Sequence, residues 1–530
     1  MSESTKKQSF LHGTMLLAMA TAIVKVIGAL YKIPLNAIIG SQGFSYYSTA
    51  YDIYNVLLMI STAGLPVAMS RMIAQASSLD RNNQIRRIYT TARGIFLGLG
   101  LIGTLLMVVF CRQLAQGLNQ PDAWAAIACL GPCCFFICLM SAYRGFFQGQ
   151  SNMIPTSVSQ VLEAITKLIV GIGLAVLVLR ATDSLSLAAG GAILGVTTSC
   201  LVSTIYLHRV FRKAYRALPN TADAPDSAGS TAKQLLAIAV PITIGSAGLQ
   251  ILTVLETRIY MGQLLNTLTQ AQADTQKGIY NMTQTIFNLP CAFITPITIS
   301  VLPSIAALLA AGKHSEVKAT EESAARVTGL IAAPCAVGLA VLAGPVTALL
   351  GGYTGDSLTL STQLMTVLGL CVIFNALVLL TNAIMQAHGH VNLPVINMFI
   401  GGVVKLVIVY ILTGNPNIGI VGTPIGTLLC YLCITVLNLV SMRRVLPDAP
   451  AIVKNVGKAV LSALLMGVAV FGVLQLLQYA GITSRVLLCA VPIVVGVVVY
   501  VLAVVKLKAI TRADAMLLPK GEKIANLLHL

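Results

Sequence analysis

The sequence predicts an all-α integral membrane protein with about fourteen transmembrane helices, arranged as two pseudo-symmetric six-helix lobes followed by two extra C-terminal helices. Composition is the first reason, because 56% of the 530 residues are hydrophobic and only 10% are charged, whereas about a quarter of a soluble protein is charged. Apolar runs of about 20 residues, the length that crosses a bilayer, recur along the whole chain. A stretch in the first half of the chain also recurs in the second half, which indicates duplication.

The apolar runs divide the chain into lobes. The N-lobe, residues 1–212, holds six predicted helices near residues 10–33, 45–70, 88–111, 123–147, 154–179 and 185–208. The C-lobe, residues 234–445, holds six more, near 234–261, 279–311, 324–350, 359–387, 393–413 and 418–441. Residues 213–233 form the most polar stretch and are predicted to be a cytoplasmic linker between the lobes. Residues 446–530 contain helices 13 and 14, near 456–479 and 485–505, and a cytoplasmic tail.

The positive charges predict the orientation of these helices, because Lys and Arg collect in cytoplasmic loops. About 25 of the 34 Lys and Arg residues fall at the N-terminus, in alternate loops and in the tail. About four fall on the other side, namely Arg112, Arg180, Lys277 and Arg485. We therefore expect both termini and the Asn220 region to be cytoplasmic, and the loops near Asp122, Asp183, Asp274 and Asp356 to be external. Topology thus explains most of the net charge of +17, and we expect no nucleic-acid partner.

The repeat joins residues 143–170 to residues 386–407. Its shared positions are Gly149, Asn152, Pro155 and Lys167 in the first copy, and Gly389, Asn392, Pro394 and Lys405 in the second. Because equivalent helices are six apart, an even number, the lobes keep the same orientation and should be related by an axis along the membrane normal. Such an architecture suits alternating access.

Charged residues inside predicted helices mark the candidate site. A lysine at the centre of a membrane helix costs roughly 2.5 to 3.5 kcal/mol, so Lys25 should face a cavity, with Asp52 as its natural partner. A purely structural ion pair explains the same two residues equally well. Lys32 lies nearer an interface, where snorkelling and a cavity role are equally good explanations.

Later helices carry further charges. Thr156, Gln160, Glu163 and Lys167 share one helix face, and Glu163 can pair with Lys167 either structurally or within a cavity. Glu256 and Arg258 are two residues apart, so they cannot both face one cavity. Asn397 and Lys405 share a face of helix 11. The intramembrane balance, 5 − 3 = +2, favours an anionic substrate; it counts Lys25, Lys32, Lys167, Arg258 and Lys405 against Asp52, Glu163 and Glu256.

Other classes of site have little support. The twelve cysteines lie almost entirely in apolar segments and are interpreted as small core residues. The chain has no phosphate-binding loop of the GxxxxGK[ST] type, so we expect no ATP hydrolysis. We also expect no enzymatic activity, no bound metal and no cofactor.

Three segments resemble the polysaccharide-transport branch of the MOP flippases, which includes stage V sporulation protein B and the MurJ-type lipid II flippases. They read KVIGALYKIPLNAIIG, GLPVAMSR and RGFFQGQSNMIPTSVSQVLEAITK, and the resemblance spans the whole chain. It implies a MATE/MurJ-like MOP fold in the bacterial plasma membrane that works by alternating access. It also implies a cationic central cavity for the pyrophosphate of an undecaprenyl-linked sugar, and a groove for the lipid tail at helices 13 and 14.

We therefore expect a flippase for an undecaprenyl-pyrophosphate-linked cell-wall precursor, lipid II or another lipid-linked oligosaccharide. The expected partners are this anionic lipid-linked substrate and membrane lipids, and we expect a monomer. Sodium ion or the membrane potential is the candidate driving force, and roles in growth and in sporulation both stay open. The alternatives are a MATE-like multidrug exporter and a cell-wall assembly partner without transport. Candidate substrate-binding residues are Lys25, Asp52, Glu163, Lys167, Arg258 and Lys405, with a possible cation site at Glu256 and Asn397.

Overall fold

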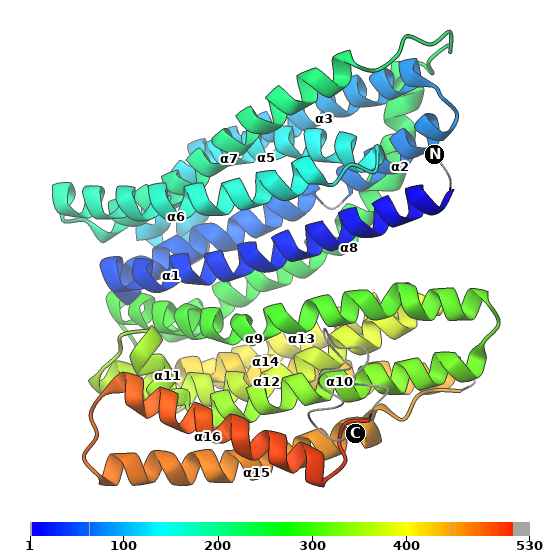
Figure 1. Ribbon diagram of the computed structural model, residues 1–530. Coiled ribbons are helices and arrows are strands. Elements are labelled where there is room, and N and C mark those ends of the chain that lie inside the picture. Colours follow the sequence, from blue (N-terminus) through cyan, green and yellow to red (C-terminus); the bar gives the residue numbers. More distant parts are fainter. Residues whose placement is uncertain (1–2, 63, 447, 512–530) are drawn as a thin grey trace. The chain divides into compact units, whose positions relative to one another are not determined.

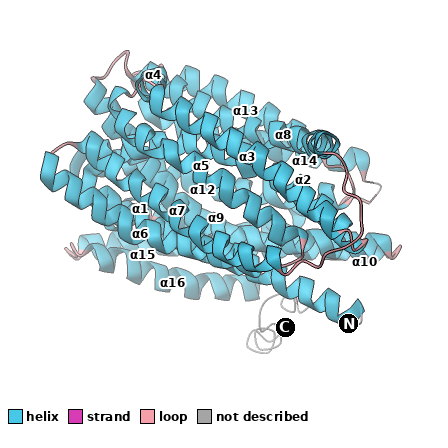
Figure 2. Ribbon diagram, turned by 90° about the horizontal axis from the view of Figure 1, so that it is seen from above, coloured by secondary structure: helices cyan, strands magenta, loops and turns pink. Residues whose placement is uncertain are grey.

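The computed structural model describes the backbone of residues 3–62, 64–446 and 448–511. Within these ranges the side chains of residues 3–19, 21, 22, 245, 249, 296–300 and 303 are not described. Lys6, Lys7 and the tail from Arg512 onward therefore lie outside the described side chains, and the location of both termini stays a prediction. The described residues form helices, turns and loops without a strand (Figure 2), as the sequence predicts.

Helix α1 (Glu3–Thr62) contains both of the first two predicted helices. Its helical geometry breaks at Gly40, where φ is 66° and ψ is 173°, a left-handed backbone conformation that glycine adopts at little cost. The chain reverses direction at Gly40. The evidence is that Tyr31 and Tyr47, one from each half of α1, have ring centres only 5.9 Å apart. A second break separates α1 from α2 around Gly64 and Pro66.

The chain forms two compact units, Met1–Asn281 and Met282–Leu530. In the first unit α5 and α7 form a buried centre, with α3 beside α5, α6 beside α7, and α8 against α1 and α2 (Figure 1). Because α8 packs against α1 and α2, it belongs to the first unit, and the boundary between the two units falls inside α9 rather than at residues 213–233. The division into two six-helix lobes stays a prediction. The elements of this unit are α2 (Leu65–Ser78), α3 (Asn82–Val109), α4 (Cys111–Gly117), η1 (Pro121–Ala123), α5 (Trp124–Gly149), α6 (Ile154–Thr182), α7 (Leu185–Arg216), α8 (Ala228–Leu264) and the start of α9 (Gln270–Ala310).

In the second unit an apolar core joins α10, α12, α14 and α15 around Leu380, Ile384, Met442 and Val456. The two C-terminal helices, α15 and α16, pack on each other, and they also contact α10 and α11. The remaining elements are α10 (His314–Val341), α11 (Ala343–Leu350), α12 (Gly355–Ala387), α13 (Asn392–Thr413), η2 (Gly419–Val421), α14 (Gly422–Val445), α15 (Ile452–Tyr479) and α16 (Arg485–Lys506).

Twelve helical segments of the described chain are long and apolar enough to cross a membrane. The first, Ile23–Ser78, has 56 residues, or roughly 84 Å of helix, far more than the ~30 Å of a hydrocarbon core. Its reversal at Gly40 divides it into two spans. The two spans of this first segment, the other eleven segments and α9 correspond one by one to the fourteen predicted helices. The all-helical membrane fold is therefore confirmed.

The first unit has two distinct ends. At the end called here the Asp122 end, the hydroxyl of Tyr46 donates to Asp122 at 3.3 Å and to Asp274 at 3.2 Å. The hydroxyl of Ser186, just after Asp183, donates to the carbonyl of Asp122. Three of the four loops predicted to be external therefore lie together.

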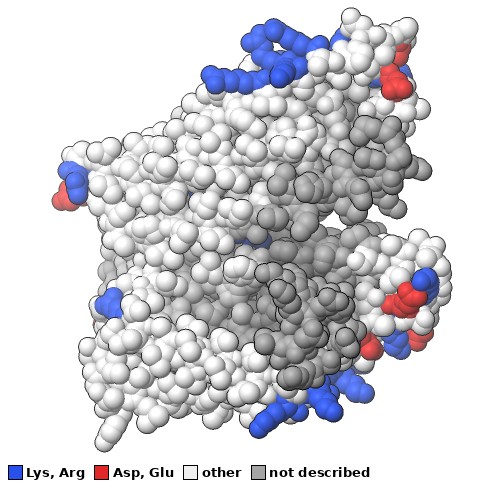
Figure 3. Space-filling view, in the orientation of Figure 1, with Lys and Arg blue, Asp and Glu red and all other residues white. Residues whose placement is uncertain are grey.

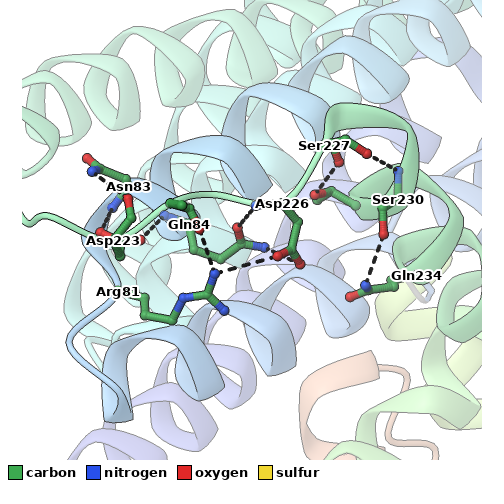
Figure 4. Close-up of polar contacts among 10 residues, drawn as sticks. Arg81, Asn83, Gln84, Asp223, Asp226, Ser227, Ser230 and Gln234 are labelled. Carbon is green, nitrogen blue, oxygen red and sulfur yellow. Dashed lines mark hydrogen bonds and ion pairs between the residues drawn. The ribbon is translucent and has the colours of Figure 1, made fainter.

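At the opposite Asn220 end, the linker is fastened to the start of α3. The amides of Asn83 and Gln84 donate to the Asp223 carboxylate at 3.1 and 3.0 Å, and Arg81 pairs with Asp226 at 3.5 Å (Figure 4). Desolvation raises the pKa of Asp223, but hydrogen bonds from Thr221, Asn83 and Gln84 outweigh it and hold the pKa below its ordinary value. Arg86 donates to Asn220 at 2.9 Å, and Lys and Arg side chains gather on the surface near this end (Figure 3).

This arrangement makes the topology testable. In cells carrying Asn220→Cys in a Cys111→Ser background, a membrane-impermeant maleimide is expected to label position 220 only after the membrane is permeabilised. The reason is that Asn220 lies among Arg81 and Arg86, in a loop of the positive-inside type. Asp183→Cys, at the opposite end, should label in intact cells. Labelling of position 220 in intact cells would contradict the predicted helix orientation.

Candidate functional site

Two lysines of the first unit meet around one tyrosine. Lys167 of α6 donates to the hydroxyl of Tyr51 at 3.3 Å, and its Nζ lies 5.7 Å from the centre of that ring. The Nζ of Lys32 in α1 lies 5.6 Å from the same ring centre. Both lysines are half-buried, and neither has a carboxylate within 4 Å among the described residues. We call Lys32, Lys167, Tyr31 and Tyr51 the lysine site.

Close packing of α6 and α7 holds Lys167 in place. A Cβ atom on Gly195 would lie 2.2 Å from the Cα of Gly171, one turn beyond Lys167, so the two backbones nearly touch. Tyr31 fits beside them and donates to the carbonyl of Ala192 at 3.2 Å, and its ring centre lies 5.6 Å from the Lys167 Nζ. Small residues at such a crossing allow close helix contact in a membrane. They therefore position both the lysine and the tyrosine.

Glu163 does not pair with Lys167 in this structure. Its carboxylate lies 3.1 Å from Arg144 of α5, and Arg144 also donates to Ser159 at 3.0 Å. The expected i, i+4 pair is replaced because α5 brings a guanidinium to the same helix face. The intrahelical interpretation was therefore wrong, and Lys167 keeps its charge facing Tyr51.

Asp52 and Lys25 are also apart. Asp52 accepts a hydrogen bond at 3.2 Å from Thr257 of α8, while Lys25 is exposed and makes no ion pair within the described part of the chain. The reversal at Gly40 brings Lys32, not Lys25, over the ring of Tyr51. The proposed Lys25–Asp52 pair is therefore wrong for this structure. A cavity role for each residue stays a prediction.

The remaining candidates lie in separate places. Glu256 is 4% exposed and Arg258 is exposed, which confirms that these neighbours point different ways. In the second unit, Asn397 donates to Asn438 at 2.9 Å and to Ser441 at 3.3 Å. Lys405 is half-buried, with its Cγ 3.7 Å from a Cβ atom built on Gly426. The cation site at Glu256 and Asn397 would join the two units, so it stays a prediction.

Sequence reasoning missed a buried polar cluster at the Asp122 end. Lys277 and Asp274 of α9 are each 0% exposed. Lys277 donates to Thr49 at 2.5 Å and to Gln120 at 2.9 Å, and Gln120 donates to Asp274 at 2.6 Å. The i, i+3 spacing of Asp274 and Lys277 at the start of an apolar run was the available signal, but Lys277 was assigned to an external loop.

Comparison with known proteins identifies the family. A family model described as "Polysaccharide biosynthesis protein" matches residues 10–309, more than half of the chain. The chain belongs to this family. A second model, MatE, matches residues 260–411.

Curated relatives of this chain include two proteins of Bacillus subtilis (strain 168). Stage V sporulation protein B of Bacillus subtilis (strain 168) is 25% identical over 448 residues, which cover 83% of this chain and 85% of that protein. Lipid II flippase MurJ of the same strain is 23% identical over 416 residues, covering 75% and 76%.

Solved structures share the fold. Lipid II flippase MurJ in an inward closed conformation has a TM-score of 0.70 at 15% identity, with 92% of this chain and 98% of that one covered. An inward-facing multidrug resistance MATE transporter has a TM-score of 0.64 at 14% identity, with 80% and 97% covered. The predicted MATE/MurJ-like fold of the MOP superfamily is therefore confirmed for this family member.

Within the described residues, no group of three or more His, Cys, Asp and Glu side chains lies close enough to hold a metal ion. All twelve cysteines are buried or half-buried, as expected for small core residues. The lysine site offers cationic groups, namely two ammonium groups beside two phenol rings.

Proposed function

We propose that this protein is a flippase that moves an undecaprenyl-pyrophosphate-linked cell-wall precursor, lipid II or another lipid-linked oligosaccharide, from the inner to the outer leaflet by alternating access. The observation that carries the proposal is the lysine site. Lys167 lies near the middle of α6, 13 residues after Ile154 and 15 before Thr182, or about 20 Å from either end. Positive charge at that depth is costly and marks a substrate pathway.

The contacts of the two lysines favour an anionic ligand. Each ammonium faces the Tyr51 ring or hydroxyl, and among the described residues no carboxylate lies within 4 Å of either one. An ammonium is a compact donor that binds phosphate as a point charge. The hydroxyl of Tyr51 accepts from Lys167 and keeps its own proton to donate, so the lysine site supports pyrophosphate binding by Lys32 and Lys167.

An apolar cavity in the second unit supports the lipid part of the proposal. It has a volume of about 430 Å³ and lies between α10, α15 and α16, lined by Gly338, Met466, Val470, Val497 and Val501 among others. Its place matches the groove at helices 13 and 14 that the family resemblance implies for a lipid tail. A cavity of this kind suits a hydrocarbon chain, because burial there removes apolar surface from water.

The multidrug exporter is the competing proposal, since MatE and MATE matches share the fold. The lysine site argues against it, because cationic drugs would meet two ammonium groups at mid-membrane. The deciding experiment is complementation of a strain depleted of its lipid II flippase. Growth with normal precursor levels on the cytoplasmic leaflet is expected. Failure to complement, combined with export of cationic dyes, would favour the exporter instead.

Filling the apolar cavity tests the tail site. A Cβ atom on Gly338 lies 3.9 Å from Met466, its one close neighbour, so Gly338→Leu is expected to occupy the cavity without a backbone clash. Complementation should fall at least several-fold while the protein level stays normal. Gly472→Leu on α15, where a Cβ meets nothing within 4 Å, is the matched control and should be neutral. Equal complementation by Gly338→Leu and Gly472→Leu would show that the substrate's lipid tail does not bind in this cavity.

A further inference from the structure

A second cavity lies in the first unit, away from the lysine site. It has a volume of about 350 Å³ and is bounded by α1, the short helix α4 and α8. Its apolar walls include Val56 of α1, Leu118 after α4, and Ile251 and Leu255 of α8. None of the four residues of the lysine site lines it. The cavity is therefore a separate place where an apolar chain can bind.

The cavity has a positively charged rim. Arg258 and Gln113 are its polar lining residues, and both are exposed. Among the described residues Arg258 makes no ion pair, and its backbone carbonyl accepts a hydrogen bond from the side-chain amide of Asn119 at 3.3 Å. Arg258 lies six residues before the end of α8 at Leu264, about 9 Å along the helix. Arg258 therefore lies near the Asp122 end of the unit.

We propose that this cavity binds an anionic glycerophospholipid, with its phosphate on Arg258 and Gln113 and one acyl chain against α1 and α8. A guanidinium presents several donors in a fixed plane and pairs well with phosphate. The apolar walls contribute by burying the acyl chain. The predicted topology places this lipid in the outer leaflet, because the Asp122 end is expected to be external.

Size distinguishes this occupant from the proposed substrate. About 350 Å³ lies at the lower limit of small-molecule sites, which span roughly 300 to 1,000 Å³. That space holds part of one acyl chain but not a lipid-linked oligosaccharide. The site therefore goes beyond the proposed flippase function, and it also gives Arg258 a role outside the lysine site.

Native mass spectrometry of the full-length protein in detergent tests the proposal, with phosphatidylglycerol and phosphatidylcholine of the same acyl chains as probes. Phosphatidylglycerol is expected to bind more tightly, and Arg258→Gln should weaken it by about tenfold or more, the effect of losing a charged hydrogen-bond partner. Arg180→Gln, at the same end of the unit, is the charge-matched control and should change little.

A second variant keeps the charge and removes the space. A Cβ atom on Gly117 of α4 meets nothing within 4 Å, so Gly117→Leu is expected to extend into the cavity and to weaken phosphatidylglycerol binding. Gly98→Leu on α3, which also has open space at its Cβ, should leave binding unchanged. Thermal unfolding in detergent reports whether each variant folds.

Three results would overturn the proposal. Equal affinity for the two phospholipids would exclude selection of a net anionic head group, and with it the proposed anionic lipid. Equal losses with Arg258→Gln and Arg180→Gln would indicate diffuse attraction to surface charge. Competition by glycerol phosphate as strong as by the intact lipid would mean that the apolar walls hold no acyl chain.

Discussion

Replacing Lys167 with alanine is expected to abolish complementation of a flippase-depleted strain. Lys167 is half-buried at the middle of α6 and donates to Tyr51 rather than to a carboxylate, so its charge is available to a pyrophosphate. Removing one partner of a desolvated charge pair costs about 2 kcal/mol or more, which corresponds to a loss of roughly thirtyfold or more. Precursor should accumulate on the cytoplasmic leaflet, and labelling of that leaflet measures it.

The controls separate the charge from the fold. Lys32→Ala should cause a similar loss, because both ammonium groups share Tyr51, and Lys167→Arg should keep part of the activity. Lys313→Ala, which removes an exposed lysine paired with Glu316 at 2.9 Å, should have no effect. The loss of complementation with Lys25→Ala should be smaller than with Lys32→Ala and larger than with Lys313→Ala, since Lys25 is exposed. Normal growth with stably expressed Lys167→Ala would remove the lysine site from the mechanism.

The second large effect is expected from a single methyl group at Gly195. Alanine there would place its Cβ 2.2 Å from the Cα and 2.4 Å from the N of Gly171, so α6 and α7 must separate. Overpacking typically costs about 1 to 3 kcal/mol, and it would also displace Lys167, one turn from Gly171. Gly195→Ala should therefore unfold at a lower temperature in detergent and flip more slowly.

Gly173 provides the matched comparison on the facing helix, α6. A Cβ atom there meets nothing within 4 Å, and alanine is favoured over glycine in a helix by up to about 1 kcal/mol. Gly173→Ala should consequently be neutral or stabilising. Equal melting temperatures for Gly195→Ala and Gly173→Ala would show that the α6–α7 crossing does not depend on glycine.

The helices and their approximate ends were predictable because long apolar runs have few alternatives in a membrane. Gly40 follows the first predicted helix, and the structure shows a reversal of the chain there, inside α1. The separation of Glu256 from Arg258 also followed from helical geometry alone. Such features depend on local sequence.

Pairings between helices were less predictable. Glu163 was assigned to Lys167 because both lie on one helix, but Arg144 reaches it from α5. Lys25 was assigned to Asp52 without knowing the register of the reversal, which instead places Lys32 beside Tyr51. Lys277 was read as an external residue, yet contacts with Thr49 and Gln120 bury it. These three cases depend on tertiary packing, which periodicity does not encode.

The most direct test is lipid flipping by the purified protein in proteoliposomes. A fluorescent undecaprenyl-pyrophosphate-linked disaccharide is placed in both leaflets, and a membrane-impermeant quencher reports how fast inner-leaflet probe becomes accessible. The wild-type protein is expected to accelerate this exchange over protein-free vesicles, and the Lys32→Gln and Lys167→Gln variants should remain near the protein-free rate. Exchange by wild type no faster than in protein-free vesicles, at verified incorporation and with a sodium gradient or potential of either sign, would contradict the flippase account.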